Sequence, residues 1–259
     1  MEKSLNDDFV FTQQSLKTFK DCPMKFKKKY IENIRWEGPY DESSRKRTEK
    51  GNDFHLMAFR YFSGIETNLK FEIDTELDRW LKSLKESFPL NKGVRYLPEH
   101  KARILEEDLR LEANFDLLLI KDGSIEIWDW KTHENKIKNP TRLQENLKNS
   151  MQTMVYLYVL KEQAQTLYGR KQDNISVSMH YWQPETPHIL AELEYNDELH
   201  RQNKRELLDL IKKTNNFDYT AFEKDLYKKH CSFCEFNMFC NNERIDFSDI
   251  EDSEYLIPF

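Results

Sequence analysis

Long apolar runs are missing from this sequence. Its 259 residues contain no stretch of about 18 apolar residues, so no transmembrane helix is expected. The residues from Met1 to Asp8 lack the basic-then-apolar order of a secretory signal peptide. Internal repeats and low-complexity tracts are absent as well. We therefore expect a cytoplasmic protein that makes no use of a membrane.

Cysteine is scarce, and its spacing is informative. In a cytoplasmic chain, four cysteines indicate metal or cluster ligation rather than disulfides. Cys231, Cys234 and Cys240 form a compact triple, and Cys22 is the natural fourth ligand. Four thiolates suit an iron–sulfur cluster or tetrahedral zinc. A lone cysteine plus a triple favours the cluster, with zinc or four unrelated buried cysteines as alternatives. Ligation would join the two ends of the folded chain.

The net charge of −6 does not indicate nucleic-acid binding, but the charges are unevenly distributed. Basic clusters occur at Lys25–Lys29 and at Arg45–Lys50, and the tail from Asp246 to Glu254 is strongly acidic. A basic groove on an acidic protein is compatible with a polyanionic substrate. A solvated face is the equally simple interpretation of each cluster alone.

The pattern of apolar residues predicts helices first and strands next. Their order indicates a mixed α/β fold around one central sheet flanked by helices. We expect one domain over 1–245, with a helical part at about 10–90, a core at about 94–195, a helix and cysteine segment at about 196–245, and an acidic tail at 246–259. The expected helices cover 11–34 with a break at Pro23, 43–62, 74–88, 141–168 and 196–214, and the expected strands cover 94–99, 102–111, 174–182 and 188–194.

The stretch from Glu112 to Thr132 predicts a β-hairpin around Asp122-Gly123. Asp129 and Lys131 are two residues apart on the second strand, so they point to one face of the sheet. If Asp116 on the first strand faces the same way, two carboxylates and an ammonium converge. Such a set can hold a divalent metal and activate water beside a phosphate. A surface hairpin with ordinary charges is the alternative, but the apolar flanks favour burial.

Further motifs give the hairpin a context, although His55, Gln152 and Tyr156 mean little alone. Together the motifs resemble the RecB-like branch of the PD-(D/E)xK nuclease superfamily, in its iron–sulfur form: the AddB nuclease domain and the small CRISPR-associated adaptation nucleases. One departure is that Ala113 and Leu117 flank the first core Asp, where the family usually has a Gly and often an Arg. The motifs, in the family's order, are Ser15–Tyr30 with Cys22, Gly51-x-x-x-His55, Asp116, Asp129-Trp-Lys131-Thr132, Gln152-x-x-x-Tyr156, and Cys231, Cys234 and Cys240.

The resemblance implies a restriction-endonuclease-like core and a set of residue roles. His55, Asp116, Asp129 and the backbone carbonyl of Trp130 would bind Mg²⁺ or Mn²⁺. Lys131 would orient or deprotonate water, or stabilise charge on the phosphate. The remaining implied roles are Gln152 and Tyr156 lining the groove, Glu99 as a secondary acidic residue, and Cys22, Cys231, Cys234 and Cys240 holding a 4Fe–4S cluster.

The function implied by the resemblance is metal-dependent DNA hydrolysis. We expect an exonuclease that prefers single-stranded DNA or ends and acts in DNA repair or CRISPR adaptation, with protein partners. The competing expectation is a catalytically silent DNA-binding scaffold of a repair or defence complex.

Overall fold

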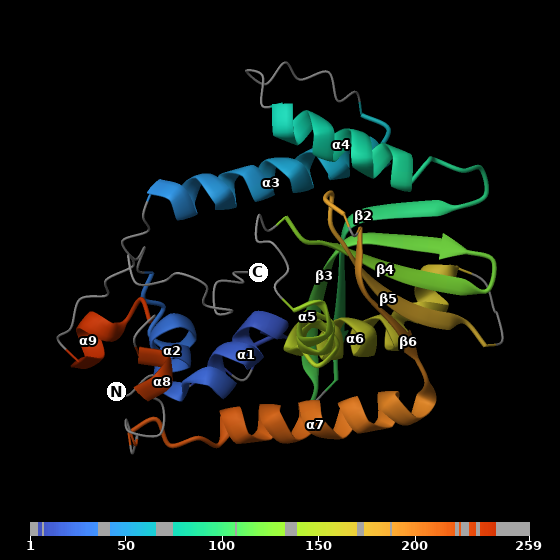
Figure 1. Cartoon of the computed structure of the whole chain (residues 1–259). Coiled ribbons are helices and arrows are strands. Elements are labelled where there is room, and N and C mark those ends of the chain that lie inside the picture. Colours follow the sequence, from blue (N-terminus) through green and yellow to red (C-terminus); the bar gives the residue numbers. More distant parts are fainter. Residues whose placement is uncertain are drawn as a thin grey trace.

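A computed structural model of the chain shows a sheet with helices on both faces (Figure 1). It describes residues 5–6, 8–35, 42–65, 75–106, 108–132, 139–169, 174–186, 188–220, 223, 228–231 and 234–241. The predicted acidic tail at 246–259 lies outside the described residues. No helix in the described ranges has the length and apolar character of a membrane span.

The sheet has six strands, and β3 pairs with three of the others. β3 pairs antiparallel with β2 and β4 and parallel with β1, while β5 runs parallel to β4 and β6 antiparallel to β5. This mixed sheet confirms the predicted fold class. The strands are β1 (Phe11–Thr12), β2 (Arg95–Leu105), β3 (Arg110–Lys121), β4 (Ser124–Trp130), β5 (Ser176–Trp182) and β6 (Ile189–Tyr195).

Two helical layers cover the sheet. α3 and α4 pack on one face, and α6, backed by α1 and α7, covers the other (Figure 1). Each layer has its own apolar core, with Val155 and Leu157 on the α6 side and Phe54 and Trp80 on the α3–α4 side. The helices are α1 (Gln13–Asp21), α2 (Pro23–Phe26), the π-helical turn η1 (Lys27–Ile31), α3 (Glu42–Phe62), α4 (Thr75–Ser87), α5 (Pro140–Lys148), α6 (Met151–Tyr168), α7 (Asp197–Asn215), α8 (Lys228–Cys231) and α9 (Asn237–Asn241).

Two predicted helices need correction, one at its start and the other in its middle. The helix expected from residue 11 begins at Gln13, because Thr12 and Ser15 form a capping box and residues 11–12 pair with β3. The break at Pro23 is confirmed, with Cys22 as the N-cap of α2. The single helix expected over 141–168 is two helices, since Ser150 Oγ accepts a hydrogen bond from the Thr153 amide and starts α6.

The strand boundaries before the hairpin were also predicted wrongly. β2 is one strand from Arg95 to Leu105, and β3 already begins at Arg110. A turn closed by reciprocal backbone hydrogen bonds between Glu106 and Leu109 separates them. Pro98 is tolerated inside β2 because, among the described strands, β2 pairs with β3 alone and is therefore an edge strand.

The alternation of β3 changes at Asp116. Phe115 packs in the core under α6, and regular alternation would place Leu117 there as well. Leu117 instead belongs to the core under α3 and α4, while Leu118 returns to the α6 side. The strand therefore switches faces at the position that carries the acidic side chain.

The partner strand is irregular at the same level. Pro98 pairs with Leu117, so the next residue of β2, Glu99, stands opposite Asp116. Glu99 has φ +48°, in the left-handed region that residues with a Cβ rarely adopt. Strained backbone of this kind clusters at functional sites. The irregularity brings the acidic residues Glu99 and Asp116 to the same level of the β2–β3 pair.

α3 approaches the end of β4 closely at Gly51. A Cβ atom at this position would lie 2.9 Å from Thr132 Oγ1, a distance that real Cβ atoms essentially never show. The space beside the Thr132 side chain, rather than the backbone conformation, therefore favours glycine at this position. This close approach joins the Gly51-x-x-x-His55 motif to the Asp129-Trp-Lys131-Thr132 motif.

We predict that Gly51→Ala lowers the free energy of unfolding by about 1–3 kcal/mol, the usual cost of overpacking. In a Thr132→Ala background the same change should stabilise the protein by up to about 1 kcal/mol, because alanine is the better helix former. Urea denaturation of the four proteins measures both effects. An equal effect of Gly51→Ala in the two backgrounds would contradict the contact.

Candidate active site

Asp129 and Lys131 form a buried ion pair at the end of β4. Lys131 Nζ lies 2.5 Å from Asp129 Oδ1, and the two residues are 7% and 2% exposed. Gln152, in the first turn of α6, forms hydrogen bonds with both partners. Its Nε2 donates to Asp129 Oδ2 at 2.5 Å, and its Oε1 accepts from Lys131 Nζ at 3.1 Å. The side-chain amide of Gln152 therefore forms hydrogen bonds with both members of the ion pair.

Asp116 lies next to this pair on β3. Leu117 pairs with Trp128, so the register brings Asp116 beside Asp129. Its Oδ2 accepts a hydrogen bond of 2.7 Å from the Trp130 backbone N–H. Both carboxylates and the ammonium thus converge where β3 and β4 diverge.

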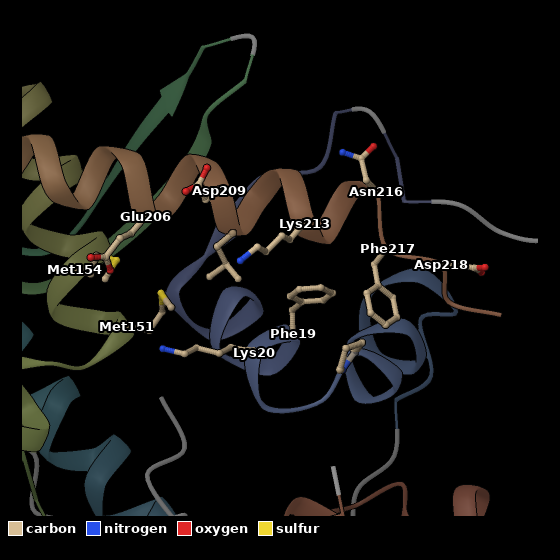
Figure 2. Close-up of a pocket in the computed structure, with 12 residues that line it drawn as sticks. Phe19, Lys20, Met151, Met154, Glu206, Asp209, Lys213, Asn216, Phe217 and Asp218 are labelled. Carbon is tan, nitrogen blue, oxygen red and sulfur yellow. The ribbon is translucent and has the colours of Figure 1, made fainter. Parts of the chain in front are cut away.

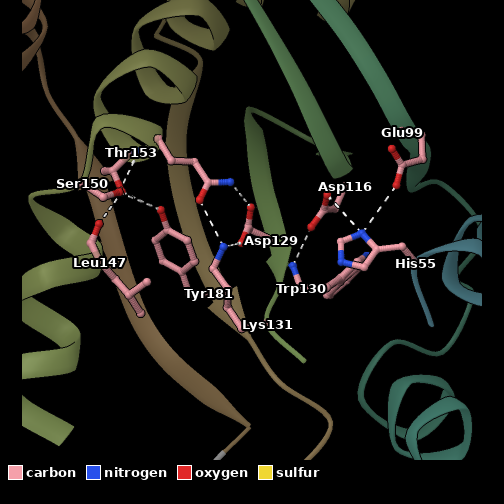
Figure 3. A network of polar contacts seen from close by, with 11 residues as sticks. His55, Glu99, Asp116, Asp129, Trp130, Lys131, Leu147, Ser150, Thr153 and Tyr181 are labelled. Carbon is pink, nitrogen blue, oxygen red and sulfur yellow. Dashed lines mark hydrogen bonds and ion pairs between the residues drawn. The ribbon is translucent and has the colours of Figure 1, made fainter. Parts of the chain in front are cut away.

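His55 and Glu99 complete a group of possible ligands with Asp116. His55 Nδ1, on α3, lies 3.5 Å from Asp116 Oδ1 and 3.8 Å from Glu99 Oε1 (Figure 3). One ligand atom from each of the three residues lies within 4.8 Å of the others. An imidazole and two carboxylates from three different elements suit a divalent cation, especially Mn²⁺.

Asp129 stands just outside this close group. Its Oδ1 is buried 2.5 Å from the Lys131 ammonium, and its Oδ2 accepts a hydrogen bond from Gln152. The Asp129 carboxylate thus adds negative charge beside the group formed by His55, Glu99 and Asp116, and a divalent cation would offset that charge. The donor set present therefore fits the divalent metal that the sequence motifs imply.

Crowded charges shift the pKa values of these groups. Burial by itself would lower the pKa of His55, but Asp116 and Glu99 outweigh it and raise that pKa to about 10. Burial raises the pKa of Asp129 to about 6, against the lowering effect of Lys131. Burial also raises the pKa of Asp116, yet His55 and the Trp130 N–H outweigh it, so this pKa lies below its ordinary value.

Tyr156 lies one turn after Gln152 on α6 and is 7% exposed. Its ring meets Phe115 edge-on at 5.2 Å. Burial, with the charges of Asp129 and Asp116, strongly raises the pKa of Tyr156. The hydroxyl therefore stays protonated and can act as a hydrogen-bond donor at the edge of the site.

Three further residues beside the site, Tyr181, Thr153 and Ser150, are not motif positions in the sequence. Tyr181 on β5 lies under Lys131, whose Nζ is 5.1 Å from the ring centroid. Its hydroxyl contacts Thr153 Oγ1 at 2.7 Å and Ser150 Oγ at 3.4 Å. Burial and Asp129 raise the pKa of Tyr181 to about 12. The register of β4 with β5 places Tyr181 beside Asp129, and the sequence carries no signal for that register.

A separate hollow lies on the other side of the first turn of α6. This cavity of about 780 Å³ is lined by Phe19, Met151, Met154 and Phe217 together with charged residues of α7 (Figure 2). It contains none of the ionisable residues described above. The candidate chemistry is therefore at the sheet, and the hollow is a distinct surface.

α2, α8 and α9, which carry or adjoin cysteines, lie at the end of the molecule opposite β5 and β6 (Figure 1). Cys22 is buried, and burial together with the nearby Cys231 and Cys240 thiols raises its pKa. Burial likewise raises the pKa of Cys234 to about 11. Two contacts hold α2 and η1 against the C-terminal segment: Lys25 to Glu235 at 2.7 Å, and Lys28 Nζ over the Phe239 ring at 5.5 Å. Lys25 and Lys28 thus keep the segment that carries Cys22 in contact with the segment that carries the other three cysteines.

A family model, the PD-(D/E)XK nuclease superfamily, matches residues 10–241. The chain belongs to the PD-(D/E)XK nuclease superfamily. The superfamily and the sheet with Asp116, Asp129 and Lys131 agree with the predicted restriction-endonuclease-like fold. The match confirms the superfamily that the motifs resemble, and the iron–sulfur RecB-like branch stays a prediction.

One solved structure agrees with this fold. The chain is similar to a candidate exonuclease from Eubacterium rectale, with 12% identity, a TM-score of 0.51 and coverage of 82% of each chain. The structure of SSO0001 matches with a TM-score of 0.36 and 12% identity, over 90% of this chain and 86% of that one. No curated protein matches the chain.

The raised pKa of His55 predicts a pH-dependent share of stability in the metal-free protein. The folded state keeps a proton on His55 that the unfolded chain releases near pH 6.5. This stabilisation is therefore complete below pH 6.5 and is lost as the pH rises through about 10. The difference in free energy of unfolding between wild type and His55→Asn should shrink over this range, as measured by urea denaturation in EDTA.

His100→Asn is the matched control. Burial and Arg95 lower the pKa of His100, so this residue loses its proton at lower pH than His55 does. The difference between wild type and His100→Asn should stay constant. A constant difference for His55→Asn as well would contradict the electrostatic arrangement of the site.

Proposed function

We propose that this protein is a divalent-metal-dependent DNA nuclease that hydrolyses phosphodiester bonds at the site described above. The observation that carries the proposal is the close group of His55, Glu99 and Asp116 beside the buried Asp129–Lys131 pair. Membership of the nuclease superfamily supports the reaction class. A cytoplasmic location remains part of the proposal.

The proposed metal ligands are His55, Asp116, Asp129 and the Trp130 backbone carbonyl. We add Glu99 to the proposal because its carboxylate lies in one close group with His55 and Asp116. Held by these residues, Mg²⁺ or Mn²⁺ would supply positive charge that polarises the scissile phosphate and lowers the pKa of a bound water. The imidazole of His55 favours Mn²⁺ over Mg²⁺.

We assign Lys131 to orient the attacking water and to stabilise charge on the phosphate. Burial lowers the pKa of Lys131, but Asp129 outweighs it and raises that pKa above its ordinary value. A lysine kept charged in this way is a poor base and a good electrostatic stabiliser. Gln152 holds Lys131 and Asp129 in place, and Tyr156 lines the groove beside them.

The proposed substrate is single-stranded DNA or a DNA end, and the proposed action is exonucleolytic. The exposed Arg45, Lys46 and Arg47 lie on α3, the helix that also carries His55. Such cations can follow a phosphate backbone, and aromatic side chains can stack on unpaired bases. The fold it shares with a candidate exonuclease supports this choice. We place the activity in DNA repair or CRISPR adaptation, together with protein partners.

We predict that Asp116→Asn lowers Mn²⁺-dependent cleavage of a labelled single-stranded oligonucleotide by about a hundredfold or more, because it removes charge at the reacting centre. Asparagine can still accept the hydrogen bond from the Trp130 N–H, so the fold should remain. Glu112→Gln on the same strand is the control, since Glu112 pairs with Arg103 away from the site. It should leave cleavage unchanged.

The result also separates the proposal from a silent scaffold. Degradation by the wild type with Mn²⁺ or Mg²⁺ and its loss in Asp116→Asn support the nuclease. Binding of single-stranded DNA without degradation by the wild type would favour the DNA-binding scaffold. Equal cleavage by wild type and Asp116→Asn would contradict the assigned site.

We propose further that Cys22, Cys231, Cys234 and Cys240 bind a 4Fe–4S cluster, with zinc as the alternative. The contacts between α2 and the C-terminal segment support a shared group. Anaerobically purified protein should absorb broadly in the visible range, and Cys22→Ser should lose this absorbance together with stability.

Lys28→Met is the matched control for Cys22→Ser. It removes the cation over Phe239, keeps all four thiols and should retain the absorbance. Colourless protein with stoichiometric zinc would replace the cluster by zinc. Protein with neither metal would contradict the shared ligand set.

A further inference from the structure

Tyr181 is a fully buried residue next to the candidate site. It lies near the end of β5, and the parallel register pairs it with Asp129. Its exposed fraction is 0%. No motif includes it, and it has no role in the chemistry described so far. Both ends of its side chain nevertheless contact parts of the site (Figure 3).

The ring of Tyr181 limits where the Lys131 ammonium can lie. A lysine ammonium has three donors on a flexible stem, so two polar partners leave it freedom to move. Its polar partners here are Asp129 at 2.5 Å and Gln152 at 3.1 Å. The Tyr181 ring, 5.1 Å from Nζ, adds a cation–π contact from a third element. Contacts from α6, β4 and β5 together fix the position of the Lys131 ammonium.

The hydroxyl of Tyr181 fixes the first turn of α6. Thr153 Oγ1 donates to the Leu147 carbonyl at 2.6 Å, which uses the one hydroxyl hydrogen of Thr153. The 2.7 Å contact between Thr153 and Tyr181 therefore has Tyr181 as the donor. Ser150, the N-cap of α6, lies 3.4 Å from the same hydroxyl. The start of α6 is thus attached to β5 by a directed chain of hydrogen bonds.

These two contacts meet at Gln152. Gln152 lies between Ser150 and Thr153 in the turn that the Tyr181 hydroxyl holds. It also contacts both Lys131 and Asp129. One tyrosine therefore constrains Lys131 directly through its ring and indirectly through the turn that carries Gln152.

We propose that Tyr181 is a positioning residue that sets the place of Lys131 for phosphodiester hydrolysis, a role that rests on the proposed nuclease function. The ring holds the ammonium, and the hydroxyl holds the turn that presents Gln152. The Tyr181 ring lies against the Lys131 ammonium of the Asp129–Lys131 pair, and Tyr181 acts through Lys131.

The first test measures the position of Lys131 without any substrate. In protein labelled with ¹³C at lysine Cε, the Lys131 signal is identified as the one absent from Lys131→Arg. The ring should shift the Lys131 methylene protons upfield in wild type and in Tyr181→Phe, which keeps the ring. In Tyr181→Leu they should move to the position of the other lysines. An unmoved signal in Tyr181→Leu would overturn the proposal whether or not the protein is a nuclease.

The second test measures Mn²⁺-dependent cleavage at a temperature where circular dichroism shows every variant fully folded. Tyr181→Leu should lower kcat by about tenfold or more with KM nearly unchanged, since a displaced catalytic group costs rate rather than binding. Tyr181→Phe and Thr153→Val should lower kcat by less than Tyr181→Leu does. Thr153→Ser keeps the hydroxyl that Thr153→Val removes, so its kcat should equal that of the wild type.

The outcomes separate the two claims. A purely structural tyrosine would leave kcat unchanged among fully folded variants, and that result would overturn the positioning role. Absence of cleavage by the wild type would instead refute the proposed function, while the lysine signal would still decide whether Tyr181 holds Lys131.

Discussion

The buried ion pair of Asp129 and Lys131 is the constraint on which the site depends. Removing both charges from water is costly unless each keeps good partners. Gln152 supplies them to both members of the pair. This requirement fixes the start of α6 beside the end of β4, and the break at Ser150 makes that position possible. The helix layer and the sheet are thus aligned by a polar contact rather than by apolar packing alone.

A second group of charges shares the same space and shapes the backbone around it. Asp116, Glu99 and His55 come from β3, β2 and α3, and in the metal-free protein the imidazole neutralises part of the carboxylate charge. The change of alternation at Asp116 and the positive φ of Glu99 lie at the same level of the sheet. Local strain is therefore concentrated where the proposed metal ligands converge, and the surrounding β2–β3 ladder maintains it.

Much of the fold and of the candidate site could be predicted from the periodicity and the motifs of the sequence. The period of a strand places Asp129 and Lys131 on one face, and Pro23 marks the helix break at Cys22. Glu99 could be placed only weakly, because its position depends on the register of β2 and on a left-handed backbone at a residue other than glycine. Tyr181 could not be placed at all, because the pairing of β4 with β5 follows from a crossover through α6. Such long-range registers leave no trace in the spacing of residues.

The central claim is that the sheet and α3 together build a divalent-metal site beside the Asp129–Lys131 pair. Anomalous diffraction from crystals soaked in Mn²⁺ tests this most directly. The account predicts an anomalous peak among the side chains of His55, Glu99 and Asp116, and its loss in Asp116→Asn. A Mn²⁺ peak elsewhere on the protein with none at these residues, or a peak that Asp116→Asn leaves intact, would contradict it.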